Sequence, residues 1–427
     1  MRLINIDTLA FEEYYEGQIP SYAILSHRWA HGEIMFSDFR KARRKDSSGY
    51  WKVIRLIDAT RRYNTWIRDL AEEVESQNSF VASGPILMIQ HVWIDTCCID
   101  KRSSADLSEA INSMFRWYAN ASICFVHLHD LQTSNSTPTQ PSYQQLARSV
   151  WFGRGWTLQE LLAPQRILFC NADWQFAYHK CNGDECDQLP RTAHINQELA
   201  DATGIQCRSL YRLNLDSLSA AQIFSWGSRR QTTRIEDLSY CLLGLLQVNM
   251  PLLYGEGPRA FLRLQQEVLR TKKDETIFVH TDSRLLGGHP LSYARSTDVL
   301  CLLPSRSEPL TISQNTLQLT AQAMSISVTD QGLVEFWIIP LRCTSDELSK
   351  TPGRFAILVS RDIDPAGTTY RIVNDSGLPD PPTDIVGCRL SHNGSERTRY
   401  EAWSDAHTDR RITTTRRMTW GTFLIDV

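Results

Sequence analysis

Short apolar runs alternate with helical patterns along the first 170 residues of this 427-residue chain. Residues 22–26, 86–94, 123–128 and 166–170 have the length and composition of buried strands. Apolar side chains recur at helical spacing between these runs, over residues 50–75 and 107–118 and again over 156–162. Strand and helix in alternation predict a parallel sheet that is covered by helices on both faces.

The remainder of the chain changes character twice. Residues 192–273 carry mainly helical patterns, whereas the chain after Asp274 alternates apolar and polar residues in the manner of strands, as in 316–328 and 336–341. We therefore predict three domains: an α/β domain over residues 1–170, a helical extension over 171–280 and an antiparallel β domain over 281–427.

Polar residues follow three of the predicted parallel strands. They are Ser26 to Trp29 after the first strand, Asp95 to Cys97 after the second and His127 to Asp130 after the third. Ligands of open α/β sheets bind outside the carboxyl ends of the strands, so this pattern predicts a site at that edge. The alternative is that loops are polar in any case and that these residues carry no function.

Trp156 and Glu160 stand four residues apart at the start of a predicted helix, where they would share one face. A carboxylate beside an indole is desolvated, which raises its pKa and strengthens its field at a substrate. The alternative is an ordinary amphipathic helix in which Trp156 belongs to the core and Glu160 is a solvated charge near the helix N-terminus.

Charge and hydropathy exclude several classes of protein. With 45 basic and 48 acidic side chains, the net charge of −3 offers no electrostatic basis for binding nucleic acid. No apolar run approaches the ~20 residues that span a bilayer. The first residues lack the apolar core of a signal peptide, so we expect a cytoplasmic protein whose 11 cysteines are reduced.

Two cysteine patterns were weighed as chemical sites. His179 and Cys181, with Cys186 further along, match no standard zinc spacing, so we expect no metal site. Cys97 and Cys98 are interpreted as buried thiols at a strand end, with a reactive nucleophile as the alternative.

Several longer stretches resemble a known family, the HET domain of fungal heterokaryon-incompatibility proteins. The resemblance spans Ser21 to Pro164 and lies in Tyr-Ala-Ile-Leu-Ser-His-Arg-Trp from Tyr22, Trp-Ile-Asp-Thr-Cys-Cys-Ile-Asp-Lys from Trp93 and Arg-Gly-Trp-Thr-Leu-Gln-Glu from Arg154. It continues in Thr-Thr-Arg-Ile-Glu-Asp from Thr232 and Val-Asn-Met-Pro-Leu-Leu-Tyr-Gly-Glu-Gly from Val248. It therefore covers about the first two thirds of the chain.

The HET family is similar to TIR domains, which have a flavodoxin-like fold and in many cases cleave NAD at the nicotinamide–ribose bond. The resemblance implies that Glu160 is the catalytic carboxylate and that NAD is a substrate, with no bound cofactor. It further implies that Arg28 contacts a phosphate, and that the other residues around the ligand are Ser26, Trp29, Asp95 (or Asp100 in its place) and Trp156. One departure is Ala30, where many HET sequences have glycine after the motif tryptophan.

The same resemblance implies a role in cell death and self/non-self recognition. The expected partners are NAD or a related nucleotide, a second copy of the chain in a homo-oligomer, and an upstream sensor of the NLR type or another kind. A second hypothesis remains open, in which the domain is a non-enzymatic signalling module that acts by self-assembly.

Overall fold

The computed structural model describes residues 1–76, 88–132, 143–181, 189–190, 192–282 and 286–301, together with eight strand segments between 311 and 426. The chain divides into two compact units. The first comprises residues 1–214 with 230–232, and the second comprises 215–229 with 233–427. The division into three domains stays a prediction.

The first unit is built on one eight-stranded sheet with the order β2-β1-β4-β3-β5-β6-β7-β8. The four central strands, β4, β3, β5 and β6, run parallel to one another. The strands are β1 (Arg2–Asn5), β2 (Phe11–Glu13), β3 (Tyr22–His27), β4 (His91–Trp93), β5 (Ile123–His127), β6 (Arg166–Cys170), β7 (Phe176–Cys181) and β8 (Ala193–His194).

The sheet is mixed, which corrects the expectation of a purely parallel one. Strand β1 pairs antiparallel with β2 and β4, and β7 pairs antiparallel with β6. Short turns explain the β1–β2 and β6–β7 pairs, because strands joined by a few residues can only pair antiparallel. In the turn between β6 and β7, Asn171 Oδ1 accepts hydrogen bonds from the amides of Asp173 and Gln175 at 3.0 and 2.9 Å.

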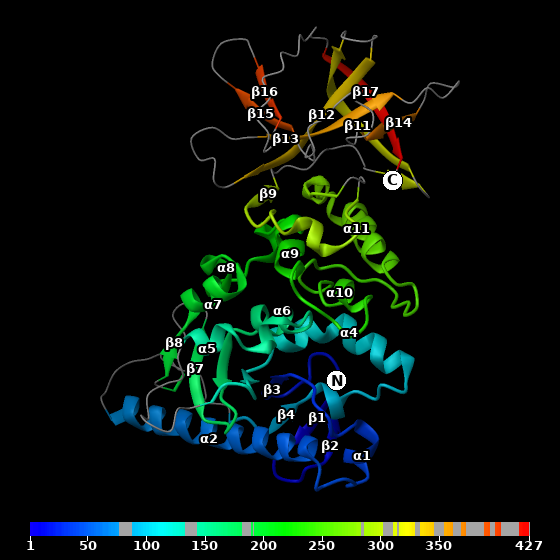
Figure 1. Ribbon diagram of the computed structural model, residues 1–427. Helices are drawn as coiled ribbons and strands as arrows, with labels where there is room; N and C mark the ends of the chain where they lie inside the picture. The colour runs from blue at the N-terminus through cyan, green and yellow to red at the C-terminus, as the bar shows by residue number, and fades with distance from the viewer. Residues whose placement is uncertain are drawn as a thin grey trace. The chain divides into compact units, whose positions relative to one another are not determined.

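Helices cover both faces of this sheet. Figure 1 shows α2 on one side and α4 and α6 on the other. The N-cap Ser103 accepts a hydrogen bond from the Asp106 amide at 3.2 Å and so fixes the start of α4. The helices of the first unit are α1 (Phe36–Arg40), α2 (Ser48–Ser76), α3 (Asp95–Cys98), α4 (Ser104–Ala119), α5 (Tyr143–Ala147), α6 (Thr157–Leu162), α7 (Asn196–Thr203) and α8 (Cys207–Tyr211), with a 3₁₀ turn η1 (Val150–Gly153).

Most of the predicted elements of the first unit are confirmed. The apolar runs 22–26, 123–128 and 166–170 correspond to β3, β5 and β6, and the patterns over 50–75, 107–118 and 156–162 correspond to α2, α4 and α6. The run 86–94 contains a shorter strand, β4, and its residues 86 and 87 lie outside the described residues.

The second unit combines helices with strands. Its helices are α9 (Ala220–Gly227), α10 (Asp237–Tyr240) and α11 (Arg259–Lys272). Its strands pair antiparallel except for β14 with β17, which are parallel. They are β9 (Val299–Cys301), β10 (Thr311–Ser313), β11 (Thr316–Val328), β12 (Val334–Ser345), β13 (Arg354–Arg361), β14 (Thr369–Ile372), β15 (Cys388–His392), β16 (Thr398–Ala402) and β17 (Met418–Asp426).

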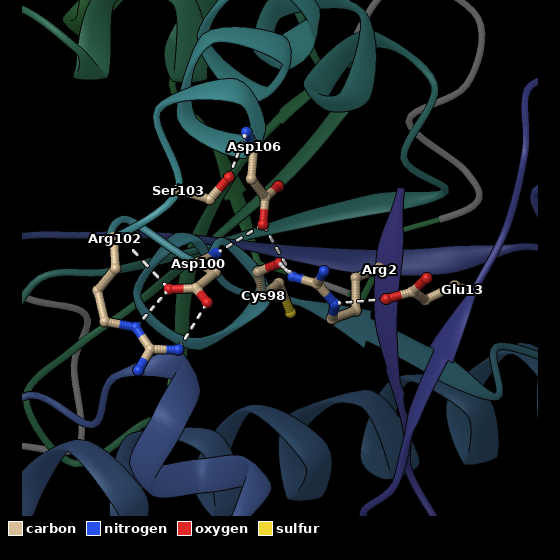
Figure 2. A network of polar contacts seen from close by, with 7 residues as sticks. All are labelled: Arg2, Glu13, Cys98, Asp100, Arg102, Ser103 and Asp106. Carbon is tan, nitrogen blue, oxygen red and sulfur yellow. Dashed lines mark hydrogen bonds and ion pairs between the residues drawn. The ribbon is translucent and has the colours of Figure 1, made fainter.

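Arg2 ties the first strand of the chain to the segment that follows β4. Its guanidinium donates to the Cys98 carbonyl at 2.9 Å, to Asp106 at 3.3 Å and to Glu13 at 3.0 Å, as Figure 2 shows. The Arg2 side chain is only 18% exposed, whereas that of Arg102 in the same figure is 70% exposed. Arg2 therefore satisfies two partly shielded groups, the Cys98 carbonyl and Asp106, whereas its third partner, Glu13, is exposed.

We predict that Arg2→Ala lowers the free energy of unfolding of the first unit by about 1–3 kcal/mol, because Cys98 and Asp106 lose a partner in a shielded place. The matched control is Arg102→Ala, which removes a solvent-exposed ion pair with Asp100 and should leave the stability nearly unchanged. Thermal unfolding of the two variants measures the difference, and equal shifts would contradict the assignment.

Candidate functional site

Ser26 and Glu160 are brought together from positions 134 residues apart. Ser26 is the fifth residue of β3, Glu160 lies in α6, and both are buried. The Ser26 hydroxyl donates a hydrogen bond to Glu160 Oε2 and accepts one from the indole Nε1 of Trp151 at 2.8 Å. Three side chains thus form one buried polar chain near the carboxyl end of β3.

The turn that precedes α6 fixes the position of Glu160. Thr157 Oγ1 donates to the carbonyls of Trp151 and Arg154 at 2.7 and 2.9 Å. The buried guanidinium of Arg230 donates to the Arg154 carbonyl at 2.9 Å and to Thr157 Oγ1 at 3.1 Å. These bonds hold the start of the helix, which then presents Glu160 to Ser26 within one turn.

The environment of Glu160 favours its protonated form. Burial is the largest cause and raises its pKa, and the charge of Asp95 adds to the effect. The hydrogen bond from Ser26 and the charges of Arg154 and Arg230 act in the opposite direction, and the net result is a pKa of about 8. At neutral pH Glu160 is therefore largely neutral, and a cation placed beside it would favour ionisation.

Trp29 and Asp95 form a second pair, at the ends of β3 and β4. The Trp29 indole Nε1 donates to Asp95 Oδ2 at 2.8 Å, while its ring is 39% exposed. Lys101 Nζ lies 3.5 Å from the same Asp95 oxygen and 3.3 Å from the centroid of the Trp29 ring. Because the Asp95 charge raises the pKa of Glu160, this pair and the buried Ser26–Glu160 pair share one electrostatic environment.

The side chains of the other predicted site residues make no hydrogen bond to the Ser26–Glu160 pair in the described part of the chain. The Arg28 side chain is exposed and makes no hydrogen bond or ion pair with the residues that the structure describes. Trp156 is half-buried at the N-cap of α6, and the indole that bonds to the Ser26–Glu160 pair is that of Trp151. Asp100 pairs with Arg102, whose hydrogen bond and charge lower its pKa to about 2.

Sequence reasoning missed Trp151 and Lys101. Trp151 belongs to the 3₁₀ turn η1 and meets Ser26 from 125 positions away, a contact that no local pattern reveals. A buried indole nevertheless needs a hydrogen-bond acceptor for its N–H. The tryptophans of the chain are therefore candidate partners for a polar side chain at a strand end. Lys101 is the last residue of the family-like stretch from Trp93, and a lone lysine there carries no signal that separates it from a surface charge.

The loop between β3 and α1 is fixed on the first turn of α2. The buried Glu33 carboxylate accepts from the Ala30 amide at 2.9 Å and from Lys52 Nζ, and it lies 3.7 Å from His27 Nε2. Burial alone would raise the pKa of Glu33, but the neighbouring His27 and the hydrogen-bonded Lys52 outweigh it and hold the pKa at about 2. A Cβ at Gly49 would lie 2.2 Å from the Ile34 amide nitrogen, so this contact requires glycine.

Comparison with known proteins assigns the central part of this unit. Residues 22–143 match the family described as heterokaryon incompatibility protein (HET). They form a HET domain. Over 257 residues the chain is 36% identical to the vegetative incompatibility protein HET-E-1 of Podospora anserina, a match that covers 59% of this chain. It spans only 16% of the length of that relative, and no solved structure matches.

Two stretches beyond the HET domain that carried the family resemblance contact each other in the second unit. Glu236, just before α10, accepts hydrogen bonds from the amides of Gly255 and Gly257 at 2.8 and 3.1 Å. Tyr254 donates to Asp237 at 2.9 Å. The stretches from Thr232 and Val248 therefore belong to one hydrogen-bonded local structure, which precedes α11 in the chain.

The described residues include no group of three or more histidine, cysteine, aspartate or glutamate side chains that could hold a metal ion. Nor is any helix in the described part of the chain long and apolar enough to cross a membrane. Cys181, in β7, is disulfide-bonded, so the expectation of reduced cysteines throughout is wrong at this position. Compartment rules describe averages over proteins, and they do not decide the state of one thiol.

We predict that Glu160→Gln stabilises the HET-domain unit increasingly as pH rises from about 4.5 to 8. Below its ordinary pKa of 4.5 the carboxyl is protonated in both the folded and the unfolded chain. Above it, the unfolded chain loses the proton while the folded chain keeps it, so the parent loses stability as pH rises toward the folded pKa of about 8. The loss at pH 7 is on the order of 3 kcal/mol at ~1.4 kcal/mol per pKa unit.

Melting temperatures of parent and variant at pH 5 and pH 8 measure this effect. Glu109→Gln, at an exposed position of α4, is the control and should show no such trend. A Glu160→Gln protein whose melting temperature follows that of the parent at both pH values would rule out the neutral buried carboxyl.

Proposed function

We propose that the first unit, which contains the HET domain, cleaves the nicotinamide–ribose bond of NAD through a TIR-like site in which Glu160 is the catalytic carboxylate. The observation that carries the proposal is the buried Glu160, held by Ser26 at the carboxyl end of β3. Numbered among themselves in chain order, the central parallel strands stand in the order 2-1-3-4, as in flavodoxin-like sheets. In that order the strand sequence reverses beside β3, where such sheets bind ligands.

The chemistry suits a carboxyl that is neutral until a cation arrives. Cleavage breaks the bond between ribose C1′ and the ring nitrogen, and the electron pair leaves with neutral nicotinamide. As the ribosyl group becomes cationic, Glu160 releases its proton to the solvent. Water then adds to C1′ and loses a proton to Glu160, so that one net proton is released with ADP-ribose. The positive charge favours the ionised form of Glu160, whose field is strong because the group is buried, so the interaction is greatest in the transition state.

The remaining residues supply orientation and binding. Ser26 holds one oxygen of Glu160, and Trp151 in turn holds Ser26. The Trp29–Asp95 pair, together with Trp156, borders the ligand, and the exposed guanidinium of Arg28 contacts a phosphate group. NAD is the substrate in this scheme, and no bound cofactor takes part.

The similarity to a vegetative incompatibility protein supports a role in heterokaryon incompatibility. In this proposal NAD depletion is the means by which a cytoplasmic effector causes cell death, in a self-associated form and under the control of a sensor protein. We further propose that the strands of the chain after residue 281 form an antiparallel domain of their own.

Nicotinamide release from NAD by the purified full chain tests the catalytic proposal. Glu160→Gln keeps the shape of the side chain and removes its charge, so the rate should fall by about 10²–10³. Glu109→Gln is the control and should keep the parental rate. A folded parent without turnover that forms oligomers as its concentration rises would overturn the proposal in favour of the self-assembly module.

The pH profile gives an independent prediction. Because the ionised carboxyl is the active form, kcat/KM should rise with pH and level off near the Glu160 pKa of about 8. Initial rates between pH 6 and pH 9.5 measure it. A flat profile, or a rate that falls as pH rises through this range, would contradict the assigned role of Glu160.

A further inference from the structure

The ammonium of Lys101 is buried without a hydrogen-bond partner. Its Nζ atom is shielded from solvent, and none of its three N–H groups makes a hydrogen bond with the residues that the structure describes. It has an ion pair with Asp95 at 3.5 Å and lies against the face of the Trp29 ring at 3.3 Å from the centroid. A cation–π contact offsets part of the desolvation of an ammonium, but it leaves the donors unused.

The surroundings of Lys101 carry a surplus of positive charge. Asp95 accepts from the Trp29 indole and faces Lys101, and Glu33, whose charge also reaches Lys101, is held by Lys52. Lys101 and Lys52 thus balance Asp95 and Glu33, and the nearby Arg28 is left over as an exposed cation at the end of β3. An anion can therefore enter this region without meeting a net negative charge.

We propose that Lys101 binds a phosphate group of the nucleotide, which takes the place of the Trp29 ring against its ammonium. A phosphate oxygen would satisfy donors that the ring cannot, and it would turn a cation–π contact into a charge-assisted hydrogen bond. Trp29 lies in the loop after β3 and is already 39% exposed, so the displaced ring stays at the surface. This inference rests on the proposed function for the choice of a nucleotide as ligand.

Calorimetric titration of the full chain with ADP-ribose, and in parallel with adenosine, tests the inference without turnover. Lys101→Met should weaken ADP-ribose binding by about tenfold or more, because a charged hydrogen bond is lost. Binding of adenosine, which has no phosphate, should stay unchanged, and Lys101→Arg should recover much of the loss. Arg102→Gln, which removes the neighbouring exposed cation, is the control and should bind like the parent.

Folding of the variant is checked by its melting temperature. Lys101→Met takes away the ion-pair partner of Asp95, so the melting temperature should fall. The fall is limited because Asp95 is partly exposed and keeps its hydrogen bond from Trp29. A folded Lys101→Met chain that binds ADP-ribose with parental affinity would overturn the inference. So would a variant that loses as much affinity for adenosine as for ADP-ribose, because Lys101 would then act only by supporting Trp29. A parent that does not bind ADP-ribose overturns it as well.

These outcomes are separable from the proposed function. A chain that binds ADP-ribose through Lys101 but releases no nicotinamide would sustain the phosphate contact and defeat the catalytic proposal. If the parent cleaves NAD and Lys101→Met leaves both KM and the affinity for ADP-ribose unaltered, the catalytic proposal stands and the phosphate contact is defeated.

Discussion

The hydrogen bond from Ser26 to the buried Glu160 is the interaction on which the arrangement of the first unit depends. Placing a carboxyl in the interior is costly unless it is neutral or well paired, and here it is neutral and paired at one oxygen. The sheet supplies the hydroxyl, α6 supplies the carboxyl, and the turn before α6 is held by Thr157 and Arg230 so that the two meet. The site and the packing of α6 on the sheet are therefore one arrangement.

Two buried carboxyl groups near the end of β3 have pKa values that are shifted in opposite directions. Glu160 is buried with cations too weakly coupled to ionise it, whereas Glu33 is buried with Lys52 and His27 close enough to keep it ionised. Glu160 therefore stays largely neutral at neutral pH, whereas the ionised Glu33 holds the loop that carries Trp29. Separation of pKa values by environment in this way is a common property of acid–base sites.

The sequence foretold much of this arrangement. Apolar runs with polar ends placed β3, β4 and β5 in one sheet, and they singled out Ser26 and Asp95 at neighbouring strand ends. It did not foretell the antiparallel flanks, because the Asn171 turn that reverses the chain is a matter of side-chain hydrogen bonding within five residues. The sequence also favoured Trp156 as the partner of Glu160, because helical spacing identifies only residues that are close along the chain. Trp151 instead contacts Ser26, which in turn bonds to Glu160.

Strand β3 presents successive residues to opposite faces of the sheet, so Ser26 and His27 look away from each other. One meets Glu160 under α6, and the other meets Glu33 beside α2. The strand is thus a rigid coupling between two helical layers: a shift of α2 that moves His27 also moves the hydroxyl on which Glu160 depends. Substitutions on the α2 side can consequently alter the acidity of Glu160 while leaving every residue that contacts Glu160 unchanged.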